Sequence, residues 1–483
     1  MGNNISRSRS ASNPDLSVPV REEFPPEVIA ASSSLLLTES TAAFVATYLR
    51  DSAAFLPDRS KKHEEEEGHV SKYLPMVSRI GAKLTGVPTD VLSVRSLVML
   101  DLSHNQITHL PSELGQLKKL ERLVLPNNHL RELPENFGDL KSLVWLDLSG
   151  NNLRDLPKSF GKLKNLRSLG MSDCGFVEMP ESLYEVEGLV KLGFFNNALR
   201  SVGPKVCNWK HLNKVDFSGN LLEALPKEII AWQELTWLNL CNNQLRHLPD
   251  ELGMLPRLEN LGLSGNKLSR IPNLSRLPLS HLPLFQNNLH EVPDWIPLCR
   301  SLQCLDVSDN HIEFVNLTKL LRLKKVGLRQ NLIKEVYIES GEQKWRLENL
   351  NLQGNQLPFL PWRIVNPVLR ELKLELNSFP EERCHHRQEP LVVPSLMVIC
   401  LQRAFKSPTC MSKLPGIVRM QVASQREEAV QCDFCKDKFV GAPTAHTSVH
   451  QVGSVWVPLR LLLCTPWCVN RFTKKMQLFK RHN

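Results

Sequence analysis

The chain has 483 residues, with 59 Lys and Arg against 50 Asp and Glu and a formal net charge of +9. Because this mild excess is spread along the chain and not concentrated on one segment, it does not indicate nucleic-acid binding. The longest apolar run, Leu459 to Cys464, is far shorter than the roughly 18 residues of a membrane span, so no transmembrane helix is expected.

The first ten residues, MGNNISRSRS, lack the apolar core of a secretory signal. The 12 cysteines are therefore expected to be thiols or metal ligands in a reducing compartment, and the chain is expected to be a cytoplasmic monomer. Residues 1–73 are rich in Ser, Pro and charge, which predicts a disordered segment. A helix near residues 41–50 would place apolar side chains on one face. It could cap the folded domain that follows it in the chain.

The extreme N-terminus matches the pattern for N-myristoylation of Gly2. The pattern requires Gly2 after removal of Met1, with Ser6 in phase, and Arg7 and Arg9 come next. One acyl chain binds membranes weakly and reversibly, and nearby basic residues strengthen that binding. The alternative is a disordered tail with a chance match.

From Leu97 the chain repeats the pattern LxxLxLxxNxL. The first eight blocks are spaced by 23 residues, and five further blocks come at steps of 21 to 24. The blocks begin at Leu97, Leu120, Leu143, Leu166, Leu189, Leu212, Leu235, Leu258, Leu279, Leu302, Leu323, Leu347 and Leu369. A degenerate block opens the series, so residues 74–380 are predicted to form an α/β leucine-rich-repeat solenoid of 13 or 14 repeats, with a curved parallel sheet on the concave face.

Each position of the repeat has a physical role. Alternate leucines of a short strand point inward, and the asparagine turns the chain with its side-chain amide bonded to neighbouring backbone. Stacked repeats should therefore form an asparagine ladder, in which Cys174 substitutes once. Leu-Pro pairs begin the convex segment, which supplies short helices. Because strands lie about 4.8 Å apart and helices need about 10 Å, the stack must bend.

The concave face of such a solenoid is predicted to bind a protein partner. Outward strand positions carry aromatic and basic side chains, which are typical anchors of protein interfaces. These candidate residues are Arg122, Trp145, Lys191, Phe195, Lys214, Trp237, Phe285 and Arg329. The alternative is a set of scattered surface residues without a shared ligand. The repeats contain no phosphate loop, metalloprotease or nucleophile-elbow motif, so no catalytic residues and no enzyme activity are predicted.

After the repeats, residues 391–420 contain a predicted helix that begins after Pro394. Ser395 is a good N-cap, and Leu396, Cys400 and Ala404 recur at i, i+4 and i+8 to form one stripe. Such a stripe either docks into the groove of a partner or caps the open end of the solenoid.

That stripe resembles the elongin C-binding box, in which the leucine enters an apolar pocket and the small cysteine permits close approach. The next segment, with Leu414, Pro415 and Ile417, looks like a degenerate cullin box. The resemblance therefore implies elongin B/C and a cullin as partners.

A cysteine quartet lies in the predicted module 428–472. Cys432 and Cys435 form a C-x2-C pair, and Cys464 and Cys468 form a C-x3-C pair. Two close thiolate pairs suit a tetrahedral structural Zn²⁺, with His446 or His450 as substitutes for one thiol. The intervening stretch VGSVWVPLRLLLC is predicted to be a strand that carries the second pair to the first, as in a zinc-ribbon-like module.

Taken together, the chain resembles the leucine-rich-repeat substrate receptors of cullin–elongin ubiquitin ligases. The resemblance implies a non-enzymatic adaptor that holds a substrate protein on its concave face. The alternative is a membrane-tethered leucine-rich-repeat scaffold of small-GTPase signalling pathways. The basic tail 473–483 is predicted to be a solvated or membrane-facing end and not a nucleic-acid site.

Overall fold

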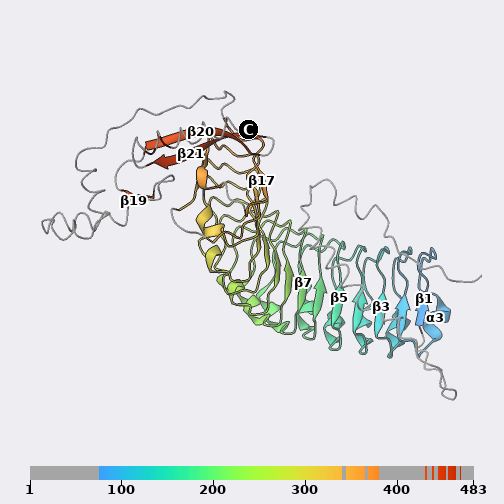
Figure 1. The fold of residues 1–483 in the computed structure, drawn as a ribbon. Helices are drawn as coiled ribbons and strands as arrows, with labels where there is room; N and C mark the ends of the chain where they lie inside the picture. Colours follow the sequence, from blue (N-terminus) through green and yellow to red (C-terminus); the bar gives the residue numbers. More distant parts are fainter. Residues whose placement is uncertain are drawn as a thin grey trace, which may run out of the picture. The chain divides into compact units, whose positions relative to one another are not determined.

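A stack of short parallel strands forms the concave side of the molecule (Figure 1). The computed structural model describes residues 76–339, 344–364, 368–379, 430–431, 438–439, 444–452, 455–463, 468 and 471. One sheet comprises β1 (Met76–Ser78), β2 (Met99–Asp101), β3 (Arg122–Val124), β4 (Trp145–Asp147), β5 (Ser168–Gly170), β6 (Lys191–Gly193), β7 (Lys214–Asp216), β8 (Trp237–Asn239) and β9 (Asn260–Gly262). A second sheet comprises β10 (His281–Pro283), β11 (Cys304–Asp306), β13 (Lys325–Gly327), β15 (Asn349–Asn351) and β17 (Glu371–Lys373). Each predicted repeat, and the degenerate opening one, supplies one strand.

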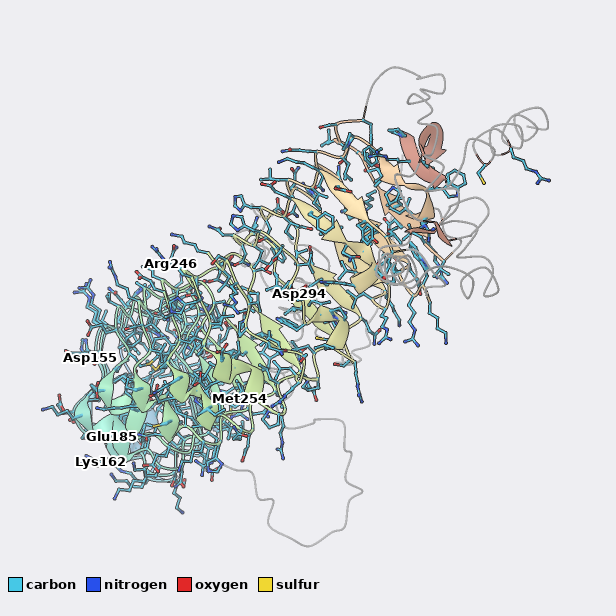
Figure 2. The ribbon with its side chains drawn as sticks, turned by 90° about the vertical axis from the view of Figure 1, so that its left-hand side faces the viewer. Asp155, Lys162, Glu185, Arg246, Met254 and Asp294 are labelled. Carbon is cyan, nitrogen blue, oxygen red and sulfur yellow. The ribbon has the colours of Figure 1, made fainter. Side chains whose placement is uncertain are left out.

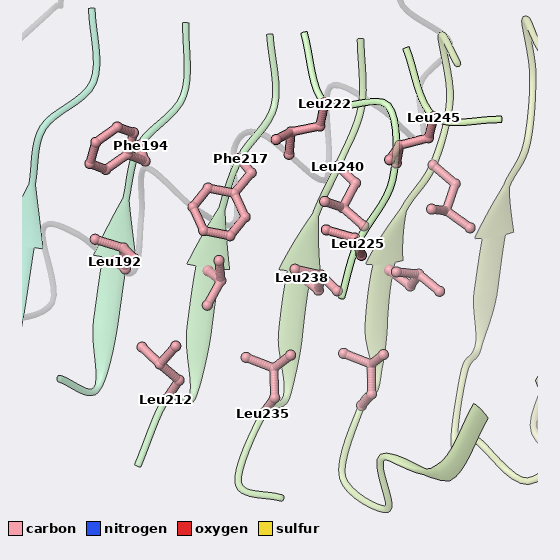
Figure 3. Close-up of a cluster of buried hydrophobic side chains, with 14 of the residues drawn as sticks. Leu192, Phe194, Leu212, Phe217, Leu222, Leu225, Leu235, Leu238, Leu240 and Leu245 are labelled. Carbon is pink, nitrogen blue, oxygen red and sulfur yellow. The ribbon is translucent and has the colours of Figure 1, made fainter. Parts of the chain in front are cut away.

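The core is a set of parallel rows of leucine and phenylalanine. Figure 3 shows such rows, with Leu212 beside Leu235 in one and Phe194 beside Phe217 in another. These side chains are completely buried. Because no single repeat can enclose its own leucines, the stacking of neighbours removes them from water and holds the solenoid together.

The predicted asparagine ladder is confirmed. Asn151 is typical: its Nδ2 donates to Leu125 O at 3.0 Å and Leu148 O at 2.7 Å, and its Oδ1 accepts from Leu130 N at 3.0 Å. Each such side chain joins its own turn to the preceding repeat. The ladder comprises Asn105, Asn128, Asn151, Asn197, Asn220, Asn243, Asn266, Asn287, Asn310, Asn331, Asn355 and Asn377. Cys174 takes one place, and its Sγ donates to Leu148 O at 3.3 Å.

The convex side carries short helices, as the Leu-Pro pairs predict. After α3 (Thr89–Ser93) they are single turns of 3-10 helix, whose tight winding fits the 23-residue repeat. They are η1 (Ser112–Gln116), η2 (Phe137–Asp139), η3 (Lys158–Lys162), η4 (Glu181–Glu185), η5 (Pro204–Asn208), η6 (Lys227–Ala231), η7 (Asp250–Met254), η8 (Ile296–Leu298), η9 (Leu317–Leu320) and η10 (Trp362–Ile364). Polar side chains on the loops and helices, among them Lys162, Glu185 and Arg246, project away from the ribbon (Figure 2).

The concave strands form two sheets because Pro283 interrupts the backbone ladder between β9 and β10. A parallel ladder needs an N–H from every second residue, and proline has none. The repeat before β10 is also two residues shorter than its predecessors, since it runs from Leu258 to Leu279. The regular 23-residue spacing thus ends where the first sheet ends.

Past this point the convex side contains short strands as well as 3-10 helices. β12 (Phe314–Asn316) pairs with β14 (Glu335–Tyr337) in parallel, and β14 lies next to β16 (Leu360–Pro361). The chain then adds a strand from far along the sequence, because β21 (Val455–Leu463) pairs in parallel with β16 through Leu360 and Leu459. Strand β20 (Thr444–Val452) pairs antiparallel with β21 (Figure 1).

The pairing with β16 places β21 where the next repeat would supply its convex strand. Leu459 is 1% exposed and joins the solenoid core, and the Arg460 guanidinium lies 4.8 Å from the Phe359 ring centre. The predicted strand between the cysteine pairs is therefore confirmed, and it also closes the last coils of the solenoid. No helix within the described residues has the length and apolar character needed to cross a bilayer.

Candidate protein-binding face

A row of six side chains crosses strands β3 to β8 on the concave face. Each occupies the first position of its strand, and each is aligned with the next by the strand register. We call this set the basic row: Arg122, Trp145, Ser168, Lys191, Lys214 and Trp237. Its five steps cover about 24 Å at the usual strand spacing. The sequence prediction placed five of these six residues on one face, and the register brings them into one line.

The basic row combines cations with aromatic rings. The Arg122 guanidinium lies 4.5 Å from the centre of the Trp145 ring, an arrangement that fixes both side chains. Phe195, four residues past Lys191 and outside β6, is half-buried. Trp237 differs from the expectation of an exposed anchor, because its side chain is only 3% exposed. Its indole therefore supports the row and offers little surface of its own.

Next to the basic row on the same concave face, the third positions of the same strands form a second row of shorter side chains. Asp147 Oδ1 accepts the Ser149 N–H at 3.0 Å, and a Cβ on Gly170 would lie 2.6 Å from this same oxygen. Asp216 Oδ1 accepts from the Ser218 N–H at 2.9 Å and from its hydroxyl at 2.6 Å. The carboxylates are thus folded back onto the backbone, whereas the longer Lys and Arg side chains reach further outward.

Burial shifts the pKa values of the cations in the basic row and of an aspartate next to them. Desolvation lowers the pKa values of Arg122, Lys191 and Lys214, since partial removal from water disfavours their charged forms. Burial also raises the pKa of Asp216 to about 6, although its hydrogen bonds to Ser218 oppose that shift. An anion that approaches the basic row would therefore meet cations that have already lost part of their hydration.

The other two predicted face residues lie beyond the break in the sheet. Phe285 comes just after β10 and is half-buried, and Arg329 comes just after β13. Burial raises the pKa of Asp309, and Arg329 opposes that rise. The candidate residues thus form one continuous group on β3 to β8 and a separate pair in the second sheet, with Pro283 between them.

A polar hollow that the sequence analysis did not predict lies on the edge of the solenoid where the asparagine turns are. Its volume is about 550 Å³. Gly150 takes a positive φ of 67° at its turn, and the Asn127 side chain of the preceding repeat lies against it. The lining residues are Asn127, Asn128, His129, Arg131, Gly150, Asn151, Asn152 and Asp173.

Most of the other predicted sites lie outside the described residues. This applies to Gly2, to the elongin-box residues Leu396, Cys400 and Ala404, to the cullin-box residues Leu414, Pro415 and Ile417, and to the metal candidates Cys432, Cys435 and Cys464. No group of His, Cys, Asp and Glu within the described ranges is arranged to hold a metal. The described cysteines Cys174, Cys207, Cys241, Cys299 and Cys304 are free thiols.

Described strands flank three cysteines of the quartet in the sequence. Strands β18 (Val430–Gln431) and β19 (Lys438–Phe439) are antiparallel, with Gln431 opposite Lys438, so Cys432 and Cys435 lie in the connection between two paired strands. Cys464 comes directly after β21. Cys468 is 2% exposed. A hairpin connection that carries two thiols can chelate through both, and four soft thiolates suit Zn²⁺.

Comparison with known proteins agrees with the fold. A family model described as leucine rich repeat matches residues 81–130, 133–176 and 210–268. The solved structure of an LRR protein from Leptospira interrogans is 30% identical and has a TM-score of 0.56, with 62% of this chain and 77% of that chain covered. No curated protein matches the sequence.

Two further solved structures share the fold. An internalin from Listeria monocytogenes is 20% identical with a TM-score of 0.52, and the match covers 62% of this chain and 86% of that chain. Toll from Drosophila, in its complex with Spatzle, is 22% identical with a TM-score of 0.55, and the match covers 63% of this chain and 44% of that chain. The repeat geometry and the Leptospira relative show that the chain belongs to the leucine-rich-repeat family, whose repeat domains serve protein–protein interaction.

Proposed function

We propose that the chain is the substrate-recognition adaptor of a cullin–elongin ubiquitin ligase. In this role the concave face holds a target protein, and the stripe Leu396, Cys400 and Ala404 docks into elongin C. The segment with Leu414, Pro415 and Ile417 then contacts a cullin. The chain itself breaks no bonds; it raises the local concentration of a target lysine near the ubiquitin donor.

The observation that carries the proposal is the SLxxxCxxxA spacing from Ser395 to Ala404, placed directly after a leucine-rich-repeat array. The pairing of β21 with β16 supports it. A competing role for the stripe is to cap the open end of the solenoid, but Leu459 already lies in the core at that end. The array therefore does not require the stripe of Leu396 as its cap.

The test is recovery of elongins B and C with the full chain. We expect both to co-purify with the wild type and to be lost with Leu396→Asp, because a carboxylate in an apolar pocket costs several kcal/mol, enough for at least about a hundredfold loss in affinity. The matched control is Leu298→Asp, at a leucine that is 63% exposed on η8. Absence of elongins from the wild type, or equal recovery with Leu396→Asp, would contradict the proposal.

The proposal includes a structural Zn²⁺ held by Cys432, Cys435, Cys464 and Cys468. Metal analysis of the purified chain is expected to give about one Zn²⁺ per molecule, as a four-thiolate site requires. Cys432→Ser with Cys435→Ser should remove it, whereas Cys207→Ser, in the solenoid helix η5, should not. A wild-type zinc content well below one per chain would exclude the site.

A second candidate function rests on Gly2. We infer for this case a scaffold held at a membrane by an acylated Gly2, in which the concave face serves signalling proteins such as those of small-GTPase pathways. The M-G-x-x-x-[ST] match at the first six residues favours it. Membrane association that Gly2→Ala abolishes, together with no elongin recovery from the wild type, would select the scaffold over the adaptor.

A further inference from the structure

Two aromatic side chains are exposed on the convex side of the second half of the solenoid. Phe314, on β12, is 50% exposed, and Tyr337, on β14, is 44% exposed. The other Phe, Tyr and Trp side chains that the structure describes are buried or half-buried. Because aromatic rings are enriched at protein interfaces, an exposed pair on neighbouring strands indicates a contact surface.

The register of β12 and β14 places both rings and one acid on the same outer face. Phe314 lies opposite Glu335, and Asn316 lies opposite Tyr337. The two rings are diagonal partners on this face, about 8 Å apart at the backbone from the usual strand spacing and rise. One long side chain of a ligand can therefore contact both rings and the acid between them.

The same position of successive repeats alternates acids with aromatic rings in this part of the solenoid. Four residues past the ladder asparagines, consecutive repeats carry Glu291, Phe314, Glu335 and Phe359. An earlier repeat has the exposed Glu132 at this position. Phe314 is thus a ring between two acids of neighbouring repeats, and strand pairing places one of them directly beside it.

The structure already contains an arginine on a ring of this column. The Arg460 guanidinium of β21 lies 4.8 Å from the centre of the Phe359 ring. The face of an aromatic ring attracts a guanidinium, whose planar fork of N–H donors also fits a carboxylate. Phe314 offers the same combination of ring and acid two repeats earlier. Within the described residues no cation lies over that ring.

The charges around Phe314 leave one acid without a partner. Lys334 pairs with Glu313 at 3.0 Å, and Lys319 pairs with Asp294. The Glu335 carboxylate has no ion pair in the part of the chain that the structure describes. The outer face therefore carries an uncompensated negative charge beside exposed rings, and this combination is complementary to a basic side chain.

We propose that the outer face of β12 and β14 binds an extended, arginine-bearing segment of a partner protein. An arginine of that segment lies over the Phe314 ring and pairs with Glu335, as Arg460 lies over Phe359. Tyr337 contacts the aliphatic part of the segment. The inference goes beyond the proposed function, since this face is on the convex side and the adaptor would hold its target on the concave side.

The test measures binding of fluorescent peptides of about nine residues to the full chain by anisotropy. The probe alternates Arg and Ser, and the reference peptide has citrulline in place of Arg, which keeps the planar side chain and removes its charge. We expect the Arg peptide to bind at least about fivefold more tightly, and we expect added salt to reduce this preference. Equal binding of both peptides to the wild type would overturn the proposal.

Two variants test the ring and the acid separately. Phe314→Leu keeps apolar surface and removes the face of the ring, and Glu335→Gln removes the charge with little change of shape. Each should reduce the preference for Arg to about twofold or less. The matched control is Glu132→Gln, which removes an exposed acid at the same repeat position far from the two strands. An undiminished preference in Phe314→Leu and Glu335→Gln, or an equal loss in the control, would contradict the site.

Other occupants of the face would give different results. Self-association of the wild type in sedimentation that Phe314→Leu removes would show a second copy there and overturn the partner assignment. If the basic tail were the occupant, Lys480→Gln with Arg481→Gln would bind the Arg peptide at least about fivefold more tightly than the wild type, because a tethered competitor would be lost. We expect a monomer and unchanged affinity in this tail variant. A wild type that prefers the Arg peptide but recovers no elongins would refute the adaptor role and leave this site standing.

Discussion

Asn151→Ala is expected to lower the free energy of unfolding by about 1 to 3 kcal/mol. The amide of Asn151 satisfies three buried backbone groups: the carbonyls of Leu125 and Leu148 and the N–H of Leu130. In the alanine variant the Leu130 N–H loses its partner, whereas Leu125 O still accepts from Asn128 Nδ2 and Leu148 O from Cys174 Sγ. One buried group left without a partner costs about 1 to 3 kcal/mol. Denaturant unfolding of the full chain, monitored by circular dichroism, measures the change.

The adjacent Asn152 provides the control. Its side chain is exposed, and its backbone N–H donates to Leu130 O at 2.8 Å, a bond that alanine keeps. Asn152→Ala should therefore change the free energy of unfolding by no more than about 0.5 kcal/mol. Similar losses in both variants would mean that the ladder does not hold the repeats together. The comparison is sharp because the two variants differ only in which of two neighbouring asparagines is removed.

Leu459→Asp is expected to release β21 from the end of the solenoid. Truncation of a fully buried leucine costs about 2 to 5 kcal/mol, and an unpaired carboxylate in its place adds a further penalty. Within the part of the chain that the structure describes, Arg460 over Phe359 and the neighbouring η10 accompany the two-residue contact between β16 and β21. Amide hydrogen exchange should therefore rise at Leu360 and along β21, while β2 to β9 remain protected.

Arg460→Ala is the control for the cap, because it removes the neighbouring cation–π contact and leaves Leu459 in the core. Such contacts contribute about 0.5 to 1 kcal/mol, so exchange at Leu360 should rise only slightly. Unchanged exchange in Leu459→Asp would contradict the assignment of β21 as the cap. Loss of protection throughout β2 to β9 would also contradict it, since the cap should act on the coils nearest to it.

The repeat geometry could be predicted from sequence because each feature arises from a local pattern. Alternating leucines define a strand with one buried face, and an asparagine at a fixed position supplies the amide that its turn needs. The register then results from the 23-residue spacing, which brings Arg122 opposite Trp145 and Lys191 opposite Lys214. The candidate face was predictable for the same reason, since outward strand positions are fixed by the period of two.

Other features could not be read from local pattern. Trp237 occupies the predicted row, yet how much of its ring reaches solvent depends on its surroundings in the fold and not on its position in the repeat. The polar hollow at Gly150 and Asp173 combines residues of successive repeats, each ordinary by itself. Pro283 is visible in the sequence. Whether it breaks the sheet depends on whether its missing N–H would have faced the neighbouring strand, and the fold decides that.

The sequence by itself determined the solenoid, its asparagine ladder and the line of basic and aromatic side chains on the concave face, because repetition converts a local period into a global register. Only the tertiary structure decided how the array ends. Leu459 lies about a hundred residues past Leu360 in the chain, and no local pattern relates them. The last coils of a solenoid have no following repeat to cover their apolar edge. A distant strand with an alternating apolar face can cover that edge, and this produces the pairing.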